Sequence, residues 1–113
     1  MNFVYVIEAD NGDVKVGMSG TPYARLSHVK REYGPRRGFK DARLVGFVRS
    51  RDALLVESAA HHHLLDFATG GEWFRVEPMK ALVTVLLAAL ILDDGAFVQR
   101  PTPRKASRGS AAR

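Results

Sequence analysis

Four side chains of this sequence carry the functional groups that hydrolysis of a phosphodiester bond requires: Tyr5, Lys15, Arg25 and Glu57. That reaction needs an activated water, neutralised charge around the phosphorus, and a stabilised leaving oxygen. A tyrosine with a pKa of about 10 is a weak base at neutral pH, but a nearby lysine ammonium favours the phenolate. A guanidinium is suited to holding non-bridging phosphate oxygens, and a carboxylate to holding Mg²⁺ or Mn²⁺.

The tyrosine and the lysine lie on a predicted β-hairpin at the start of the chain. Phe3–Ala9 and Asp13–Ser19 are rich in β-branched and aromatic residues, and Asn11-Gly12 between two such runs is a strong hairpin signal. Because side chains alternate between the faces of a strand, the register of this hairpin decides which side chains share a face.

Two registers are compatible with this turn. A two-residue turn pairs Lys15 with Glu8 and places Lys15 on the opposite face from Tyr5. A three-residue loop, with Gly12 in the left-handed conformation, pairs Tyr5 with Gly17 instead. In the second register one face carries Tyr5, Lys15, Gly17 and Ser19.

The rest of the chain predicts a small α/β (α+β) domain with a central antiparallel three-stranded sheet flanked by helices. Thr21-Pro22 is typical of a helix start, Asp52 of a helix cap, and Gly34-Pro35 of a helix end. The expected elements are a helix over 22–32, an irregular basic loop over 33–40, a strand over 42–49, a helix over 53–68, a short strand over 72–76 and an apolar helix over 79–92.

Basic residues concentrate in the segment from Arg25 to Arg51, which holds nine Lys or Arg against two acidic residues. Such an excess predicts a phosphate-facing surface, with a solvated charged face as the alternative. The side chains that we expect to contact substrate phosphates are Lys30, Arg31, Arg36, Arg37 and Lys40. Gly17 and Ser19 join them from the hairpin, since a glycine leaves room for a phosphate to approach the strand.

Glu57 stands out on the helix over 53–68, because it falls on a largely apolar stripe. Leu54, His61 and Leu65 recur on that stripe at three- and four-residue spacings. A carboxylate there either forms a salt bridge at the edge of the core or holds a cation in a cleft. His61, one turn further on, either orients Glu57 and contacts phosphate or is a core histidine satisfied by hydrogen bonds.

Neighbouring aromatic and histidine residues have simpler explanations. Trp73 and Phe74 are expected to pack in the core and at its edge rather than to stack on bases. The run from His61 to His63 does not predict a zinc site, because consecutive helical side chains point about 100° apart.

Five landmarks in this order and spacing resemble the GIY-YIG endonuclease superfamily: Phe3-Val4-Tyr5, Lys15-Val16-Gly17, Arg25, Glu57 and Gly71-Glu72-Trp73-Phe74. The sequence is most similar to the phage-type branch in which a lysine replaces the second motif tyrosine and a Glu-x-x-x-His helix leads to a Gly-Glu-Trp-Phe strand. The likeness covers about residues 3 to 76, and it favours the three-residue hairpin loop.

This resemblance implies a GIY-YIG-like fold and a metal-dependent endonuclease. Tyr5, Arg25 and Glu57 match the catalytic tyrosine, the arginine and the metal-binding glutamate, so Glu57 is the expected ligand of Mg²⁺ or Mn²⁺. Lys15 matches the second tyrosine. The superfamily's asparagine downstream of the glutamate helix has no counterpart, and Glu72 lies in the region where it would contribute.

Composition sets the remaining expectations. The chain has 113 residues, 46% hydrophobic content and no cysteine, which predict one domain without disulfides or thiolate metal sites. Residues 95–113 contain five Lys or Arg and no acid, so we expect a domain over 1–94 followed by a basic disordered tail over 95–113. No secretory signal is evident, which predicts a cytoplasmic protein.

Partners and alternatives follow from these features. DNA is the expected substrate, with single-stranded DNA or RNA as variants. The apolar helix over 79–92 is too short to span a bilayer, and it predicts either a homodimer or a helix fully buried in a monomer. Besides a nuclease, the sequence is compatible with a non-cleaving nucleic-acid-binding or regulatory module on the same fold, or with a protein-interaction domain.

Overall fold

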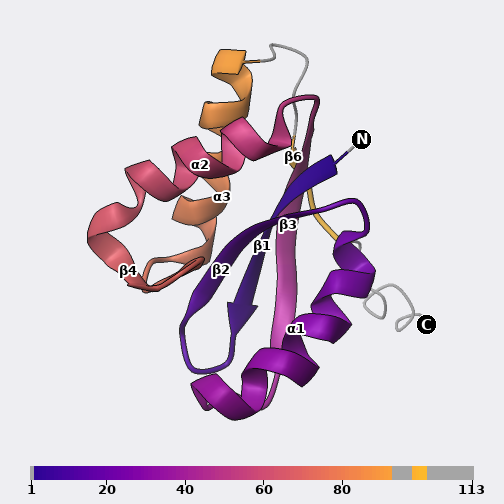
Figure 1. Ribbon diagram of the computed structural model, residues 1–113, viewed down its shortest axis with the longest axis vertical. Helices are drawn as coiled ribbons and strands as arrows, with labels where there is room; N and C mark the ends of the chain where they lie inside the picture. The colour runs from indigo at the N-terminus through magenta and orange to yellow at the C-terminus, as the bar shows by residue number, and fades with distance from the viewer. Residues whose placement is uncertain (1, 93–97, 102–113) are drawn as a thin grey trace, which may run out of the picture.

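The computed structural model describes residues 2–92 and 98–101 of the chain. Three helices and one central sheet make up this part of the protein (Figure 1). The elements in chain order are β1 (Asn2–Ala9), β2 (Val14–Ser19), α1 (Pro22–Arg37), β3 (Ala42–Ser50), α2 (Ala53–His63), a 3₁₀ turn (Leu65–Phe67), β4 (Ala68–Gly70), β5 (Trp73–Phe74), α3 (Pro78–Leu92) and β6 (Val98–Gln99).

The fold is α+β, and its antiparallel sheet has six strands in the described part of the chain, in the order β4-β5-β2-β1-β3-β6. The expected three-stranded sheet is therefore wrong. β1, β2 and β3 form its centre as predicted, and β4, β5 and β6 extend it at the two edges. The short strand predicted over 72–76 is present as β5, whereas β4 and β6, with three and two residues, are too short for a pattern of alternation to reveal them in a sequence.

The hairpin has the register of the three-residue loop. Tyr5 is paired with Gly17 and Ile7 with Lys15. The Ala9 N–H donates to the Asp13 carbonyl over 2.8 Å, and Gly12 closes the turn at a φ of 95°. A β-carbon is strained at this φ, which explains the glycine. The prediction that Tyr5 and Lys15 share a face is confirmed.

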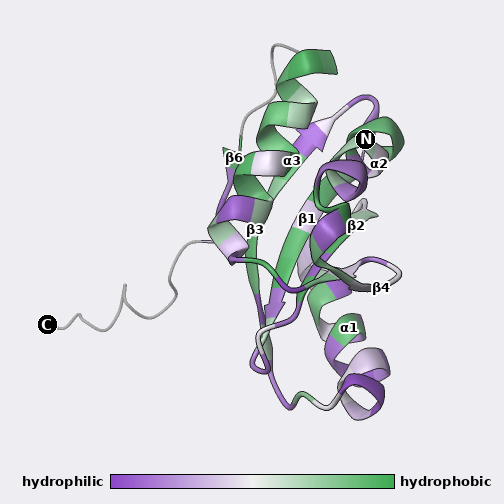
Figure 2. Ribbon diagram, turned by 90° about the vertical axis from the view of Figure 1, so that its left-hand side faces the viewer, coloured by the Kyte–Doolittle hydropathy of each residue, from purple (hydrophilic) through white to green (hydrophobic). Residues whose placement is uncertain are grey.

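The two faces of the sheet are covered by different helices (Figures 1 and 2). Val4, Val6 and Val16 point to the face where α2 and α3 pack, in the larger hydrophobic cluster. Tyr5 and Ile7, one residue out of phase, join Val29 of α1 and the aromatic residues of the smaller cluster. The hairpin is thus buried on both sides, and its odd-numbered residues face α1.

Helix α1 runs to Arg37, five residues beyond the expected end, so the predicted irregular loop over 33–40 is wrong for most of its length. Gly34 and Pro35 lie inside the helix and do not end it. A β-carbon at Gly34 would come within 2.9 Å of the Phe39 carbonyl oxygen, so glycine serves close packing there rather than a turn. The helix ends at Gly38, which has a φ of 78° and donates its N–H to the Gly34 carbonyl.

Helix α2 ends at His63, earlier than predicted, and a 3₁₀ turn and β4 occupy the rest of the expected helix. The predicted apolar stripe is partly wrong, because Leu54 and Leu65 are more than 60% exposed. The buried face is rotated by about one residue and contains Val56, Glu57 and Ala60. Small residues on this face let α2 lie close to the sheet and to α3.

Helix α3 begins at Pro78 and confirms the predicted helix over 79–92. Its buried side consists of small and branched residues such as Ala81, Val85 and Ala89, so the helix is not enclosed on all sides. No described helix is long and apolar enough to cross a membrane. Within the expected tail, Val98–Gln99 pair with β3 as an edge strand, while residues 93–97 and 102–113 lie outside the described part.

Candidate active site

A polar cleft of about 630 Å³ opens where the hairpin, the inner side of α1 and the β4–β5 turn meet. Three predicted catalytic side chains and two predicted phosphate-binding arginines line it. The full lining is Tyr5, Lys15, Met18, Arg25, Tyr33, Arg36, Arg37, Gly70, Gly71, Glu72 and Trp73.

The Tyr5 side chain lies across Gly17 on the neighbouring strand. An added β-carbon at Gly17 would be 2.5 Å from the Tyr5 Cζ atom and would overlap the hydroxyl oxygen. The residue itself is 1% exposed, so its ring belongs to the core. Gly17 therefore makes room for the tyrosine hydroxyl, rather than for a phosphate as the sequence suggested.

Lys15 is buried, with 4% of its surface exposed, and its ammonium lies between two tyrosine rings. Nζ is 5.6 Å from the Tyr5 ring centroid and 5.5 Å from that of Tyr33, and it forms an ion pair with the Glu72 carboxylate. Burial alone would lower the pKa of Lys15, but Tyr5 and Glu72 together raise this pKa above its usual value. The lysine is charged at neutral pH.

Burial raises the pKa of the Tyr5 phenol above its usual value. The neighbouring Lys15 ammonium acts in the expected opposite direction and lowers this pKa, as does the charge of Arg25. Desolvation outweighs both cations, because a phenolate in this enclosed position loses its hydration. The predominant species at neutral pH is the neutral phenol.

Arg25 and Glu57 lie near Tyr5 and Lys15 but belong to different layers of the fold. Arg25 lies in the first turns of α1 and lines the cleft. Glu57 lies on α2 and is 9% exposed, outside the cleft lining. The charge of Glu72 raises the pKa of Glu57, and Glu72 is also paired with Lys15, so Glu72 links Glu57 to Lys15 electrostatically.

Glu57 on one side of the sheet can act on Lys15 and Glu72 on the other side because the edge of β2 is partly unpaired. β5 pairs with β2 at Val14 and Lys15, and the Val16 N–H donates to the Glu72 carbonyl over 3.0 Å. Among the described strands, none pairs with Gly17–Ser19 on this side. Side chains from both faces can therefore meet around this open edge.

The Glu57 and Glu72 carboxyls supply the hard oxygen ligands that Mg²⁺ and Mn²⁺ prefer. Burial and the neighbouring Glu72 raise the pKa of Glu57, while His61 and Lys15 lower it less. Neighbouring carboxylates repel each other when both are ionised, and a divalent ion would relieve that repulsion. Water would complete the shell, since no group of three or more acidic, His or Cys ligands occurs among the described residues.

His61 and Ser19 lie near the site but outside the cleft lining. The His61 Nε2 atom is 2.7 Å from the Val16 carbonyl oxygen, and its ring packs at 5.3 Å from that of Phe74. This is the arrangement of a histidine satisfied by the fold. The Ser19 hydroxyl accepts the Thr21 N–H over 3.0 Å and so shapes the entry into α1.

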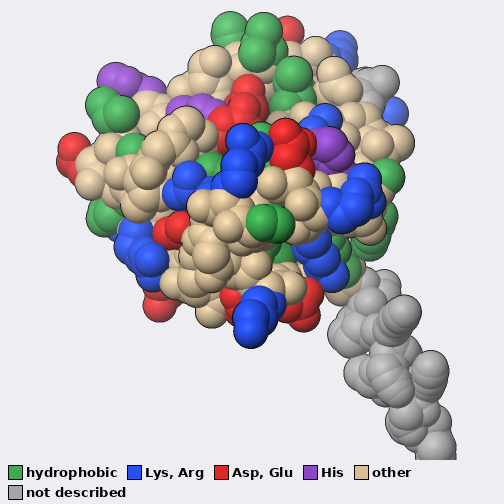
Figure 3. Space-filling model, turned by 60° about the horizontal axis from the view of Figure 1, so that its bottom comes forward, with side chains coloured by type: hydrophobic (Ala, Val, Ile, Leu, Met, Phe, Trp, Pro, Cys, Tyr) green, Lys and Arg blue, Asp and Glu red, His purple; other side chains and the backbone are tan. Residues whose placement is uncertain are grey.

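The predicted phosphate-binding residues separate into two groups. Arg36 and Arg37 line the cleft, whereas Lys30, Arg31 and Lys40 do not. Lys30 is paired with Asp41 at 3.1 Å. On the face in Figure 3, Lys and Arg side chains are interspersed with Asp and Glu, so the excess of positive charge counted along the sequence is diluted in space.

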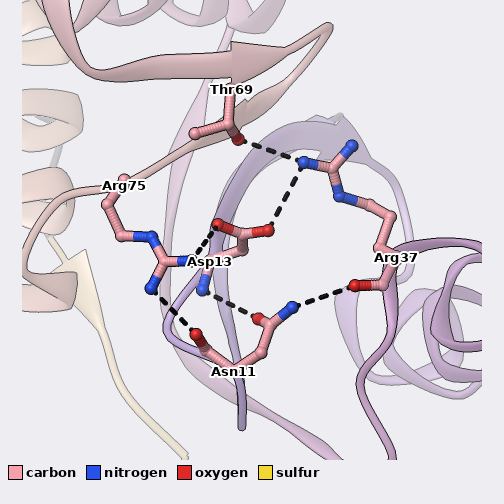
Figure 4. A network of polar contacts seen from close by, with 5 residues as sticks. All are labelled: Asn11, Asp13, Arg37, Thr69 and Arg75. Atoms are coloured by element: carbon pink, nitrogen blue, oxygen red, sulfur yellow. Dashed lines mark hydrogen bonds and ion pairs between the residues drawn. The ribbon is translucent and has the colours of Figure 1, made fainter.

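Arg37 is held in a polar network at the mouth of the cleft (Figure 4). Its guanidinium contacts the Asp13 carboxylate at 3.4 Å and donates to the Thr69 hydroxyl at 3.0 Å. Asp13 also pairs with Arg75 at 3.3 Å, and Asn11 donates to the Arg37 carbonyl oxygen. The network joins the hairpin turn, the end of α1 and the β4–β5 segment, so Arg37 braces the cleft.

We expect Asp13→Ala to destabilise the protein by about 1–3 kcal/mol, because it leaves two arginines without their shared carboxylate. Urea unfolding followed by circular dichroism measures this change. Asp41→Ala is the matched control, since Asp41 pairs with Lys30 at the exposed surface, where such pairs contribute about 0–1 kcal/mol. Equal effects of the two substitutions would contradict the bracing role of the network.

Sequence reasoning missed Tyr33 as a cleft residue and Glu72 as the link between Lys15 and Glu57. A signal for Tyr33 was present, because Arg25, Tyr33 and Arg36 recur at spacings of eight and three residues, which place them on one side of a continuous helix. The predicted helix end at Gly34-Pro35 concealed that spacing. Trp73 and Phe74 are buried as predicted.

Comparison with protein families gives a match over most of the chain. The family model described as the T5orf172 domain matches residues 2–89, a range that includes the hairpin, α1, β3, α2 and the β4–β5 segment. Comparisons with curated proteins and with solved structures give no match.

Proposed function

The chain belongs to the T5orf172 domain family, and from that premise together with the cleft we propose that it is a metal-dependent endonuclease of the GIY-YIG type that hydrolyses phosphodiester bonds in DNA. One observation supports this proposal most directly. Tyr5, Lys15, Glu72 and Glu57 form a continuous chain of electrostatic interactions, and Arg25 lines the same cleft.

The proposed roles follow from these contacts. Tyr5 orients the attacking water and accepts its proton, while Lys15 lowers the cost of forming the phenolate. Arg25 holds the non-bridging oxygens as the new bond from water to phosphorus forms and the bond to the leaving 3′ oxygen breaks. A bound Mg²⁺ or Mn²⁺ would stabilise the leaving oxygen. Glu57 and Glu72 would hold the ion.

Glu72 also accounts for the missing asparagine of the resembled superfamily. Asn2 and Asn11 are the asparagines of the chain, and neither lines the cleft. Glu72 lies in the cleft, is paired with Lys15 and raises the pKa of Glu57 through its charge. We propose that this glutamate takes over the asparagine's positioning role while adding a negative charge.

The test of the proposed function is incubation with supercoiled plasmid and with single-stranded circular DNA, in EDTA, Mg²⁺ or Mn²⁺. We expect nicks or breaks only in the presence of the divalent ions, detected by gel electrophoresis. Tyr5→Phe, which keeps the ring that fills the core, is the control for a contaminating nuclease. DNA binding without cleavage under every condition would instead support the non-cleaving module.

The pH dependence of cleavage tests the role of Tyr5. Because the pKa of Tyr5 is raised, the phenolate fraction should increase about tenfold per pH unit between pH 7 and 9, and the rate with it. Lys15→Met should slow the reaction at each pH, since it removes a charge that lowers this pKa. Single-turnover rates measure both effects, and a flat wild-type profile over this range would contradict Tyr5 as the base.

We further propose that the protein forms a homodimer through α3. Met79, Val83, Leu87 and Ile91 recur every four residues on this helix and are 44–80% exposed. Such an apolar stripe is unusual on a monomer surface. A two-fold dimer would present two active sites to the two strands of a duplex.

Leu87→Glu should convert the dimer to a monomer, because it places charges at the middle of the stripe. Light scattering at micromolar concentration measures the mass, which is 12.5 kDa for one chain. Arg31→Glu, at an exposed position of α1 on the other face of the sheet, is the control and should leave the mass unchanged. A wild-type mass of one chain would contradict the dimer.

A further inference from the structure

One wall of the cleft is built from aromatic and cationic side chains that the hydrolytic roles above do not use. Tyr33 is half-buried on α1, with its ring centroid 5.7 Å from that of Trp73. The Arg36 guanidinium carbon lies 5.1 Å from the Tyr33 centroid, and the Arg37 guanidinium carbon 4.7 Å from the Trp73 centroid. Alternation of aromatic rings and guanidinium groups is typical of surfaces that stack on nucleobases.

The two aromatic side chains of this wall differ in accessibility. Trp73 is 3% exposed and packs against Phe39 at 5.6 Å, so it belongs to the core. Tyr33 packs at the edge of the same cluster and keeps part of its surface in the cleft. Trp73 therefore supports the ring of Tyr33, and Tyr33 is the aromatic group available to a ligand.

Arg36 covers Tyr33 without being fixed there. Its side chain is 62% exposed, and its guanidinium pairs with Glu32 at 3.3 Å on the helix surface, an arrangement that contributes little to stability. The arginine can therefore move aside, or stack on the far side of a ring inserted over Tyr33.

The β4–β5 turn leaves the cleft open beside this wall. Gly70 and Gly71 line the cleft at φ values of 138° and 57°. A β-carbon at Gly71 would meet no atom within 4 Å, and one at Gly70 would meet only the Arg37 side chain at 3.7 Å. These residues present bare backbone, next to which a flat ring can lie.

We propose that Tyr33 and Arg36 form a stacking site for one unpaired nucleobase, adjacent to the phosphate that Arg25 holds. This inference rests on the proposed function and specifies its substrate as DNA with an unpaired nucleotide at the cut, such as a single strand or a flap. Lys15 ties the two sites together, because its ammonium lies 5.5 Å from the Tyr33 ring and beside the Tyr5 phenol.

The dimensions of the cleft agree with a single nucleotide. A volume of about 630 Å³ is within the range of pockets that enclose one small molecule. Bases inside a duplex are covered on both faces by their neighbours, so a paired base would first have to leave the stack to reach Tyr33. An unpaired base reaches it without that cost.

The test is binding of a 12-nucleotide oligo-dT strand and of a 12-unit abasic strand with the same backbone charge, measured by fluorescence anisotropy in EDTA. We expect wild-type protein to bind oligo-dT roughly tenfold more tightly than the abasic strand, as stacking on one aromatic side chain provides. Tyr33→Phe should keep this preference and Tyr33→Leu should lose it.

Tyr23→Leu is the matched control, because Tyr23 lies on the same helix, is 58% exposed and is outside this cleft. It should keep the preference of the wild type. If wild-type protein binds the oligo-dT strand and the abasic strand equally well, the stacking site is overturned but the proposed function stands. This comparison requires no variant. A preference that survives Tyr33→Leu also overturns it. Absence of binding to either strand overturns the stacking site, and cleavage of supercoiled plasmid then decides whether the proposed function stands.

Discussion

Glu57→Gln is expected to abolish cleavage and, at the same time, to raise the thermal stability of the metal-free protein. The amide keeps the shape of the side chain but lacks the charge that holds a divalent ion, so we expect a rate loss of about 10²–10³-fold. The stability gain follows from burial and from Glu72, which raise the pKa of Glu57 and so disfavour its ionised form in the folded state.

The sign of the stability effect can be worked out from this raised pKa. Below the usual glutamate pKa of about 4.5, the carboxyl is neutral in both the folded and the unfolded protein, and the variant gains nothing. As the pH rises from there through the folded-state pKa, the wild type loses stability that the amide retains. We expect the melting temperature of the variant to exceed that of the wild type at neutral pH, and the two to agree below about pH 4.5.

Two further variants separate the metal site from other causes. Arg25→Ala should reduce cleavage to a similar extent without the gain in stability, because it removes a phosphate contact rather than a buried carboxylate. Arg31→Ala, outside the cleft, should cleave as the wild type. A Glu57→Gln protein that cleaves normally with Mg²⁺ would show that the assigned metal site is wrong.

Gly17→Ala should have the second large effect, since one methyl group there overlaps the Tyr5 hydroxyl. The backbone of paired strands cannot yield easily, so the tyrosine ring must turn away from Lys15 or the core must expand. Overpacking of this kind costs about 1–3 kcal/mol, and displacement of Tyr5 should lower the rate at least 10²-fold. Thermal unfolding and single-turnover cleavage measure the two effects.

Gly20→Ala is the control for a loss of backbone flexibility at the same end of the hairpin. A β-carbon at Gly20 would be 3.4 Å from the Asn2 Oδ1 atom, a contact that small adjustments relieve. We expect it to keep near-wild-type stability and rate. If Gly17→Ala behaves in the same way, the close approach of Tyr5 to this strand is not required for activity.

Local signals in the sequence were sufficient to locate the hairpin and the helix starts, and the family resemblance selected the register of the hairpin. The choice between the two registers of Asn11-Gly12 determined that Tyr5 and Lys15 share a face, and Gly12 has the positive φ that the three-residue loop requires. Thr21 and Pro22 mark the start of α1 as predicted. These features depend on residues close together in the chain, so composition and spacing carry the information.

Tertiary packing decided the lengths of the helices and the edges of the sheet. Gly34 was expected to end α1, but it lies inside the helix because the Phe39 carbonyl packs against it. The short strands β5 and β6 form because the central strands β2 and β3 offer edges for them, and β4 then pairs with β5. A local stretch of sequence predicts neither feature. The edge strands depend on partners that are distant in the sequence, and the packing at Gly34 depends on the path that the chain takes after the helix ends.

The candidate site likewise combines features that the sequence predicted with features that depend on tertiary packing. The sequence by itself determined which functional groups are available, because Tyr5, Lys15, Arg25 and Glu57 could be selected by residue type and by the resemblance they support. Only the tertiary structure decided that Glu72 joins Lys15 to Glu57, and that burial outweighs the neighbouring cations at Tyr5. Desolvation and contacts across an open strand edge arise when separate layers pack together, so they have no counterpart in the linear spacing of residues.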